Sequence, residues 1–120
     1  MVTQKIIPFE GDLINGAFHL NEEIDGEWEV RSPGDLKDVI IQPRFKHAHI
    51  DQACLAAKAA FLPWARLGLE KRKEYLFRLK EIYLSRANEL AEVISRETGK
   101  PLWESKTEVK AMVGKIDITL

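Results

Sequence analysis

The chain has 120 residues, of which 45% are hydrophobic and 31% charged, and its net charge at neutral pH is -1. This length and balance suffice for one globular domain and argue against disorder. The near-neutral charge gives no general attraction to nucleic acid or to an anionic membrane, so we expect neither as a partner. A single cysteine, no apolar run approaching the roughly 18 residues of a membrane span and no signal-like apolar segment at the start predict a cytoplasmic setting without disulfides.

The first 45 residues or so predict short strands and turns. Asn15-Gly16 lies between two apolar pairs, and this dipeptide suits the two positive φ angles of a type I′ hairpin turn. Residues 21–25 are polar and predict a loop. Residues 28–31 and 39–42 then predict two strands joined across Ser32-Pro33-Gly34-Asp35.

From His49 onward the apolar period becomes helical. The first predicted helix ends at Pro63, with Trp64 capping the corner, and its apolar face consists of Ile50, Ala53, Cys54, Ala57, Ala60 and Phe61. A second helix begins near Gly68-Leu69, and its inner stripe consists of Tyr75, Leu76, Leu79, Ile82 and Tyr83. Asn88-Glu89 either interrupt this helix or lie within one kinked helix that continues to Thr98.

The most informative stretch is a helical corner around Gly99. Leu90, Val93, Ile94 and Glu97 fall at helical spacing, and Gly99 supplies the left-handed residue that commonly ends a helix. Pro101 suits the first turn of a new helix, whose apolar residues are Leu102, Val109, Met112, Val113 and Ile116. Together these stripes are more apolar surface than two short hairpins can cover, so we expect the isolated chain to self-associate.

The run Glu97-Thr98-Gly99-Lys100-Pro101, followed by Glu104 and by Glu108-Val109, resembles the N-terminal region of the NAD(P)-dependent aldehyde dehydrogenase family. The wider neighbourhood to Ile116 is most similar to the succinylglutamate semialdehyde dehydrogenase branch of that family. The resemblance implies an α/β, Rossmann-like family fold, of which this chain is an N-terminal portion. That portion comprises two N-terminal β-hairpins in residues 1–46 and three or four α-helices in residues 47–120, the latter being the helical part of the cofactor domain.

The resemblance also implies a reaction. In this family a Cys thiolate adds to the aldehyde, hydride passes to NAD or NADP, and a Glu activates the water that releases the acid. Neither these residues nor a Gly-x-Gly-x-x-Gly or Walker-type loop occur in the 120 residues, so no catalytic or cofactor-binding residue is assigned and the chain alone is predicted inactive. The implied partners are the remainder of the aldehyde dehydrogenase and further copies in a homo-oligomer.

One metal role follows from the resemblance, because an acidic side chain near Glu108 helps bind a structural monovalent cation in some members. The sequence leaves open which aldehyde is oxidised, NAD versus NADP and the oligomer number. A competing hypothesis is a free-standing helical protein-interaction module, which would be favoured by a complete gene product with its apolar stripes mutually buried.

Other tempting residues predict ordinary structure. Cys54 lies within an apolar helix stripe, which favours a buried structural thiol over a reactive one. His47, His49, Asp51 and Cys54 lack the second ligand group of a zinc site, so a solvated helix start is expected. Residues 66–86 contain seven basic and three acidic residues, interleaved as on a solvated helix face that includes an i, i+4 pair of Glu74 with Arg78. Glu104 and Glu108, also at i, i+4, predict surface carboxylates.

Overall fold

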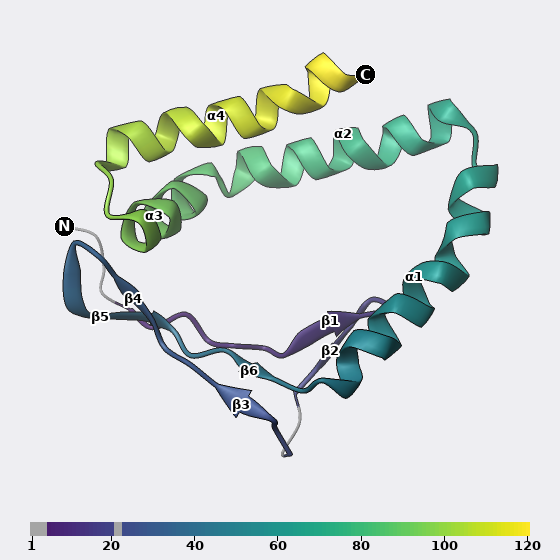
Figure 1. Ribbon diagram of the computed structural model, residues 1–120. Coiled ribbons are helices and arrows are strands. Elements are labelled where there is room, and N and C mark those ends of the chain that lie inside the picture. The colour runs from purple at the N-terminus through teal and green to yellow at the C-terminus, as the bar shows by residue number, and fades with distance from the viewer. Residues whose placement is uncertain (1–4, 21–22) are drawn as a thin grey trace.

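A computed structural model describes residues 5–20 and 23–120, and it places short strands before helices, as predicted (Figure 1). The strands are β1 (Asp12–Ile14), β2 (Ala17–His19), β3 (Gly26–Glu27), β4 (Val30–Ser32), β5 (Asp35–Ile41) and β6 (Arg44–Phe45). They form three separate antiparallel pairs, β1 with β2, β3 with β6, and β4 with β5. Within the described residues the parallel contact is limited to a single bridge between Ile7 and Ile41, so the Rossmann-like sheet of the family stays a prediction.

The predicted hairpin turn at Asn15-Gly16 is confirmed. Ile14 pairs with Ala17, which leaves a two-residue loop in which Asn15 has φ 51° and Gly16 has φ 80°. These positive angles give the turn a twist that matches the flanking strands. Of the predicted loop at 21–25, residues 21–22 lie outside the described residues, and 23–25 belong to no strand.

The second hairpin is also present, but its first strand is shorter than predicted. Ser32 pairs with Asp35, so Pro33-Gly34 forms a two-residue loop in place of the predicted four-residue connection, and the strands begin at Val30 and Asp35 rather than at Trp28 and Val39. Residue 27 pairs instead with Arg44, in the β3–β6 pair that the sequence patterns did not predict. Between β3 and β4 the chain passes from the β3–β6 pair to the β4–β5 pair, so the strand predicted at residues 28–31 is interrupted.

Four helices follow, α1 (Ala48–Arg66), α2 (Leu69–Ser85), α3 (Ala87–Thr98) and α4 (Leu102–Thr119). The prediction that Pro63 ends the first helix is wrong, because α1 continues through it to Arg66. Pro63 lacks the N–H that would bond the carbonyl of Ala59, but both residues are exposed, so solvent can satisfy that carbonyl. The predicted break at Asn88-Glu89 lies two residues earlier, at Arg86, whose φ of -109° separates α2 from α3.

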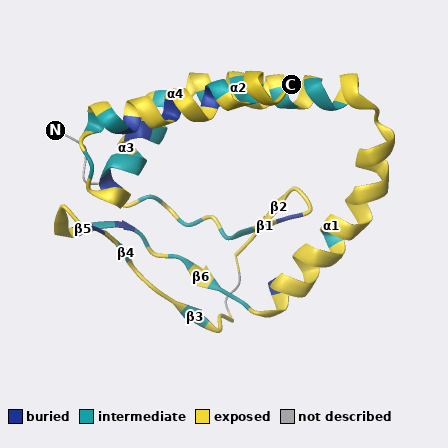
Figure 2. Cartoon of the chain, turned by 45° about the horizontal axis from the view of Figure 1, so that its top comes forward, coloured by how far each residue is buried: buried dark blue, intermediate teal, exposed yellow. Residues whose placement is uncertain are grey.

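The core lies between α3 and α4. Ala91, Val109 and Val113 are buried together, and half-buried apolar side chains from α2, α3 and α4 pack around them, namely Tyr83, Ala87, Leu90, Ile94 and Leu102. Figure 2 shows this burial concentrated on α3 and α4 and sparse along α1 and α2. The α3–α4 corner is therefore the packed part of the molecule.

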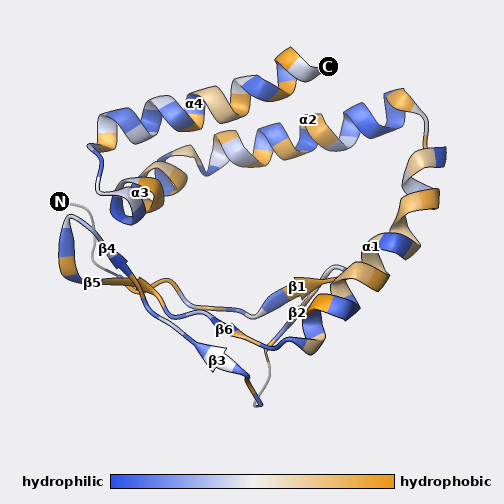
Figure 3. Ribbon diagram, viewed as in Figure 1, coloured by the Kyte–Doolittle hydropathy of each residue, from blue (hydrophilic) through white to orange (hydrophobic). Residues whose placement is uncertain are grey.

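Helix α1 is mostly uncovered. Its main contact is with β1, and His49 is its one buried residue. Ile50 and Phe61 of the predicted apolar face are 61% and 64% exposed, and Figure 3 shows α1 coloured mostly hydrophobic, with a few hydrophilic residues between. Cys54 is exposed, so the prediction of a buried thiol is wrong, because no described element packs on that face of α1. The trace is also open, since its radius of gyration is 17.3 Å, whereas a compact domain of this length has roughly 14 Å.

Candidate functional site

The Glu97–Pro101 corner is built as the sequence predicts. Gly99 has φ 73° and ψ 7°, and its N–H donates to the carbonyl of Ser95 at 2.9 Å to close α3. The corner rests on the turn of the second hairpin, where a Cβ on Gly99 would lie 3.0 Å from Cγ of Pro33. Glycine is thus required twice, by the left-handed backbone and by the close approach of the hairpin.

A buried ion pair joins α3 to the hairpins. Nε and Nη2 of Arg96 donate to the two carboxylate oxygens of Asp38 at 2.9 and 2.7 Å, and Nη1 donates to the carbonyl of Lys5 at 3.0 Å. Both charged side chains are less than a tenth exposed. The hydrogen bond from Arg96 lowers the pKa of Asp38, so its contribution to stability is present above the ordinary carboxyl pKa and is lost as pH falls through the lowered value.

The sequence did not predict this pair. Glu97 falls at helical spacing with Leu90, Val93 and Ile94, but Glu97 is exposed and Arg96 is the buried residue of that turn. A buried arginine is uncommon unless it is paired, and its partner Asp38 is 58 residues away along the chain. No local pattern connects two residues at that separation.

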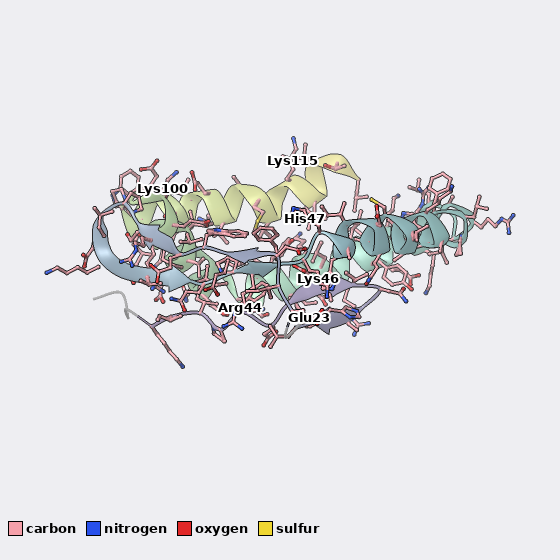
Figure 4. All side chains as sticks on the ribbon, turned by 60° about the horizontal axis from the view of Figure 1, so that its bottom comes forward. Glu23, Arg44, Lys46, His47, Lys100 and Lys115 are labelled. Carbon is pink, nitrogen blue, oxygen red and sulfur yellow. The ribbon has the colours of Figure 1, made fainter. Side chains whose placement is uncertain are left out.

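The two carboxylates that follow the corner share one lysine. Nζ of Lys100, labelled in Figure 4 near the start of α4, donates to Oε1 of Glu108 and lies 3.9 Å from Oε1 of Glu104. The hydrogen bond to Glu108 raises the pKa of Lys100. No group of three or more His, Cys, Asp or Glu that could hold a metal is found in residues 5–20 and 23–120. The monovalent-cation role of Glu108 stays a prediction.

The start of α1 is less solvated than predicted. His49 is buried and its Nδ1 lies 2.6 Å from Oδ2 of Asp12 on β1, with the ring of His19 in edge contact at 5.9 Å. His47 is exposed, and its backbone N–H donates to Asp25 at 2.6 Å, which lowers the pKa of that carboxyl. The expectation of a solvated helix start is thus wrong for His49, because β1 packs over it.

The basic segment between residues 66 and 86 is largely paired with carboxylates. Its ion pairs are Lys71 with Glu74, Lys73 with Glu70, Lys80 with Asp117 and Arg86 with Glu89. The predicted pair of Glu74 with Arg78 is not formed, because Lys71 at i-3 takes the Glu74 carboxylate. This distribution of opposite charges is that of a solvated helix face.

The described residues do not fit a dinucleotide site. Such sites form at the carboxyl ends of neighbouring parallel strands, next to a helix N-terminus approached through a glycine-rich turn. The strands described here form separate antiparallel pairs. The described residues therefore carry no step that uses NAD or NADP.

Among the described helices, none has the length and apolar character needed to cross a membrane.

The comparison with known families agrees with the corner motif. Residues 20–120 match the model of the aldehyde dehydrogenase family, which is most of the chain. The chain belongs to the aldehyde dehydrogenase family.

Two relatives show which branch of the family this chain is similar to. The chain is 58% identical to N-succinylglutamate 5-semialdehyde dehydrogenase of Chromobacterium violaceum, over 81% of this chain and 22% of that protein. It is 49% identical to the N-succinylglutamate 5-semialdehyde dehydrogenase of Escherichia coli strain HS, over 61% of this chain and 15% of that protein. The chain thus spans about a fifth or less of the length of these curated relatives.

Proposed function

We propose that this chain is the N-terminal portion of an enzyme that oxidises N-succinylglutamate 5-semialdehyde, or a closely related semialdehyde, to the acid with NAD or NADP. The observation that supports this most is the 58% identity to a relative of that name. In such an enzyme the Cys nucleophile, the Glu base and the cofactor site belong to the other part of the polypeptide. These 120 residues contribute scaffold and are inactive alone.

The remainder of the same enzyme is the proposed partner of the exposed apolar faces. The radius of gyration exceeds that of a compact domain by several ångströms. Large apolar side chains stay exposed on α1 and α2, among them Phe61 at 64% and Ile82 at 48%. Burying such surface is favourable by roughly 25 cal/mol per Å², so a covering layer would stabilise the observed arrangement. Further copies in a homo-oligomer are proposed on the same grounds.

The alternative of a free-standing interaction module has less support. It requires the apolar stripes to bury one another, but in the described residues only Tyr83 of the α2 stripe, and no residue of the α1 stripe, packs against the core cluster. The ring of Trp64 is in edge contact with Tyr75 of the α2 stripe at 5.5 Å, but Tyr75 stays 51% exposed.

The test compares two proteins. The gene product that contains this chain should reduce NAD or NADP when given N-succinylglutamate 5-semialdehyde, measured by NAD(P)H absorbance, and the 120-residue chain should not. Cys54→Ser in the short chain is the control, because Cys54 is its one thiol. Turnover by the short chain that survives Cys54→Ser would contradict the scaffold role, and turnover that disappears would make Cys54 a nucleophile.

A further inference from the structure

Lys100 lies in the short connection between α3 and α4, and its backbone is held in place there. Its carbonyl accepts a hydrogen bond from the Ser95 hydroxyl at 2.7 Å, and the N–H of the preceding Gly99 closes α3. The Lys100 side chain is only 25% exposed, whereas that of Lys71, in an ion pair within α2, is 53% exposed. The ammonium group of Lys100 is therefore presented to α4 from a fixed point of the backbone.

Two carboxylates of α4 face this one ammonium group. Glu104 and Glu108 are one turn apart, so they lie on the same side of the helix. Nζ of Lys100 donates to Oε1 of Glu108 and lies 3.9 Å from Oε1 of Glu104. Glu104 also belongs to the first turn of α4, where the positive end of the helix dipole stabilises an acidic side chain. The lysine and the helix end together compensate the charge of both carboxylates.

A free Na⁺ or K⁺ at Glu108 does not fit this arrangement. Such an ion needs several oxygen ligands, whereas the group in contact with Glu108 is an ammonium, which donates hydrogen bonds and has no lone pair to offer. A second cation beside the ammonium would also be repelled, because like charges a few ångströms apart interact unfavourably. The hydrogen bond to Glu108 raises the pKa of Lys100, so this lysine keeps its charge at neutral pH.

We infer that the Lys100 ammonium is the resident cation of the α3–α4 corner, in the position at Glu108 that the family resemblance gives to a free monovalent ion. This cation is covalently part of the chain, so its presence at the corner does not depend on the salt in the medium. The stability that the corner gives the enzyme is consequently independent of K⁺ and Na⁺. Glu108 becomes available to a free ion only when the lysine is removed.

The experiment measures the Tm of the full-length enzyme by differential scanning calorimetry in KCl, NaCl and choline chloride at equal ionic strength. The readout is the rise in Tm in K⁺ or Na⁺ over that in choline, which is too large to take the place of either ion. Wild type and Glu108→Gln should show the same rise. Lys100→Met should show a rise larger by at least about 1 °C, because an ion then binds the folded state through the freed carboxylates. Adding Glu108→Gln to Lys100→Met should remove this gain.

Lys115→Met is the matched control, because Lys115 is an exposed lysine of α4 about four turns from Lys100 (Figure 4). This variant should show the wild-type rise in Tm, and so should Lys100→Arg, which keeps a positive charge at the corner. A wild-type rise that Glu108→Gln abolishes would overturn the inference, since Glu108 would then bind a free ion with Lys100 in place. An absent gain in Lys100→Met, or an equal gain in Lys115→Met, would also overturn it. If Lys100→Met does not fold, the comparison of wild type with Glu108→Gln decides.

Discussion

The α3–α4 corner and the α1 helix were both predicted from apolar periodicity, but only the corner is packed. In the corner, Val109 and Val113 of α4 are buried against Ala91 of α3, and Gly99 rests on the hairpin turn. In α1, Ile50 and Phe61 stay more than half exposed. The difference shows that an amphipathic pattern predicts a face to be buried, but not whether its partner lies within the same 120 residues.

The two regions also differ in how charge is used. The corner contains the buried pair of Arg96 with Asp38, which connects a helix to a hairpin strand. At the other end, α1 meets β1 through His49 and Asp12, of which the carboxylate is 37% exposed. The first contact lies within packed structure and the second at its edge, so their loss should have unequal consequences.

The largest effect is expected from breaking the buried pair. Arg96→Met keeps the length of the side chain but leaves Asp38 buried without its cation, which typically costs about 3 kcal/mol or more. Urea unfolding followed by circular dichroism should show a matching fall in the unfolding midpoint. Arg86→Met removes the exposed pair with Glu89 and should cost no more than about 1 kcal/mol. Equal losses in the two variants would show that Arg96 is not buried in solution.

A smaller effect is expected at the corner glycine. Gly99→Ala places a Cβ 3.0 Å from Pro33 at a positive φ and should destabilise the chain by roughly 1–3 kcal/mol. Gly114→Ala is the control, because Gly114 is within α4 and a Cβ there meets nothing within 4 Å. This change should be neutral or stabilising by up to about 1 kcal/mol, since alanine favours helix. An unchanged midpoint for Gly99→Ala would mean that α3 does not end at Gly99.

The smallest effect on stability is expected on α1. Ile50→Ser with Phe61→Ser changes exposed side chains, so the free energy of unfolding should change by no more than about 0.5 kcal/mol. Self-association, measured by sedimentation at several concentrations, should nevertheless weaken, because both residues belong to the uncovered apolar face of α1. Leu36→Ser, at a residue 71% exposed in the second hairpin, is the control and should leave self-association unchanged. A wild-type chain that stays monomeric at high concentration would instead favour the self-contained module.

Local chemistry explains which features were predictable. Asn15-Gly16 and Gly99 were placed correctly because positive φ angles are strongly selective for residue type. The helix end predicted at Pro63 was wrong, because a helix can continue through a proline where solvent can reach the carbonyl that the proline leaves without a donor. The last turn of α1 is open to solvent in this way. Cys54 was predicted to be buried and His49 to be solvated, and the structure shows the reverse. The position of β1 decides which residue of α1 is covered, and β1 packs over His49.

The sequence by itself determined the succession of strands and helices, the two-residue turn at Asn15-Gly16, the glycine-ended corner and, through the resemblance of the Glu97–Pro101 run, the family. The structural features among these are properties of neighbouring residues, so backbone preference and spacing are enough to establish them, whereas the family rests on the resemblance alone. Tertiary structure alone decided the pairing of β3 with β6 and the burial of Arg96 against Asp38. Those features join segments that lie far apart in the chain, and their free energy depends on distances that no local pattern encodes.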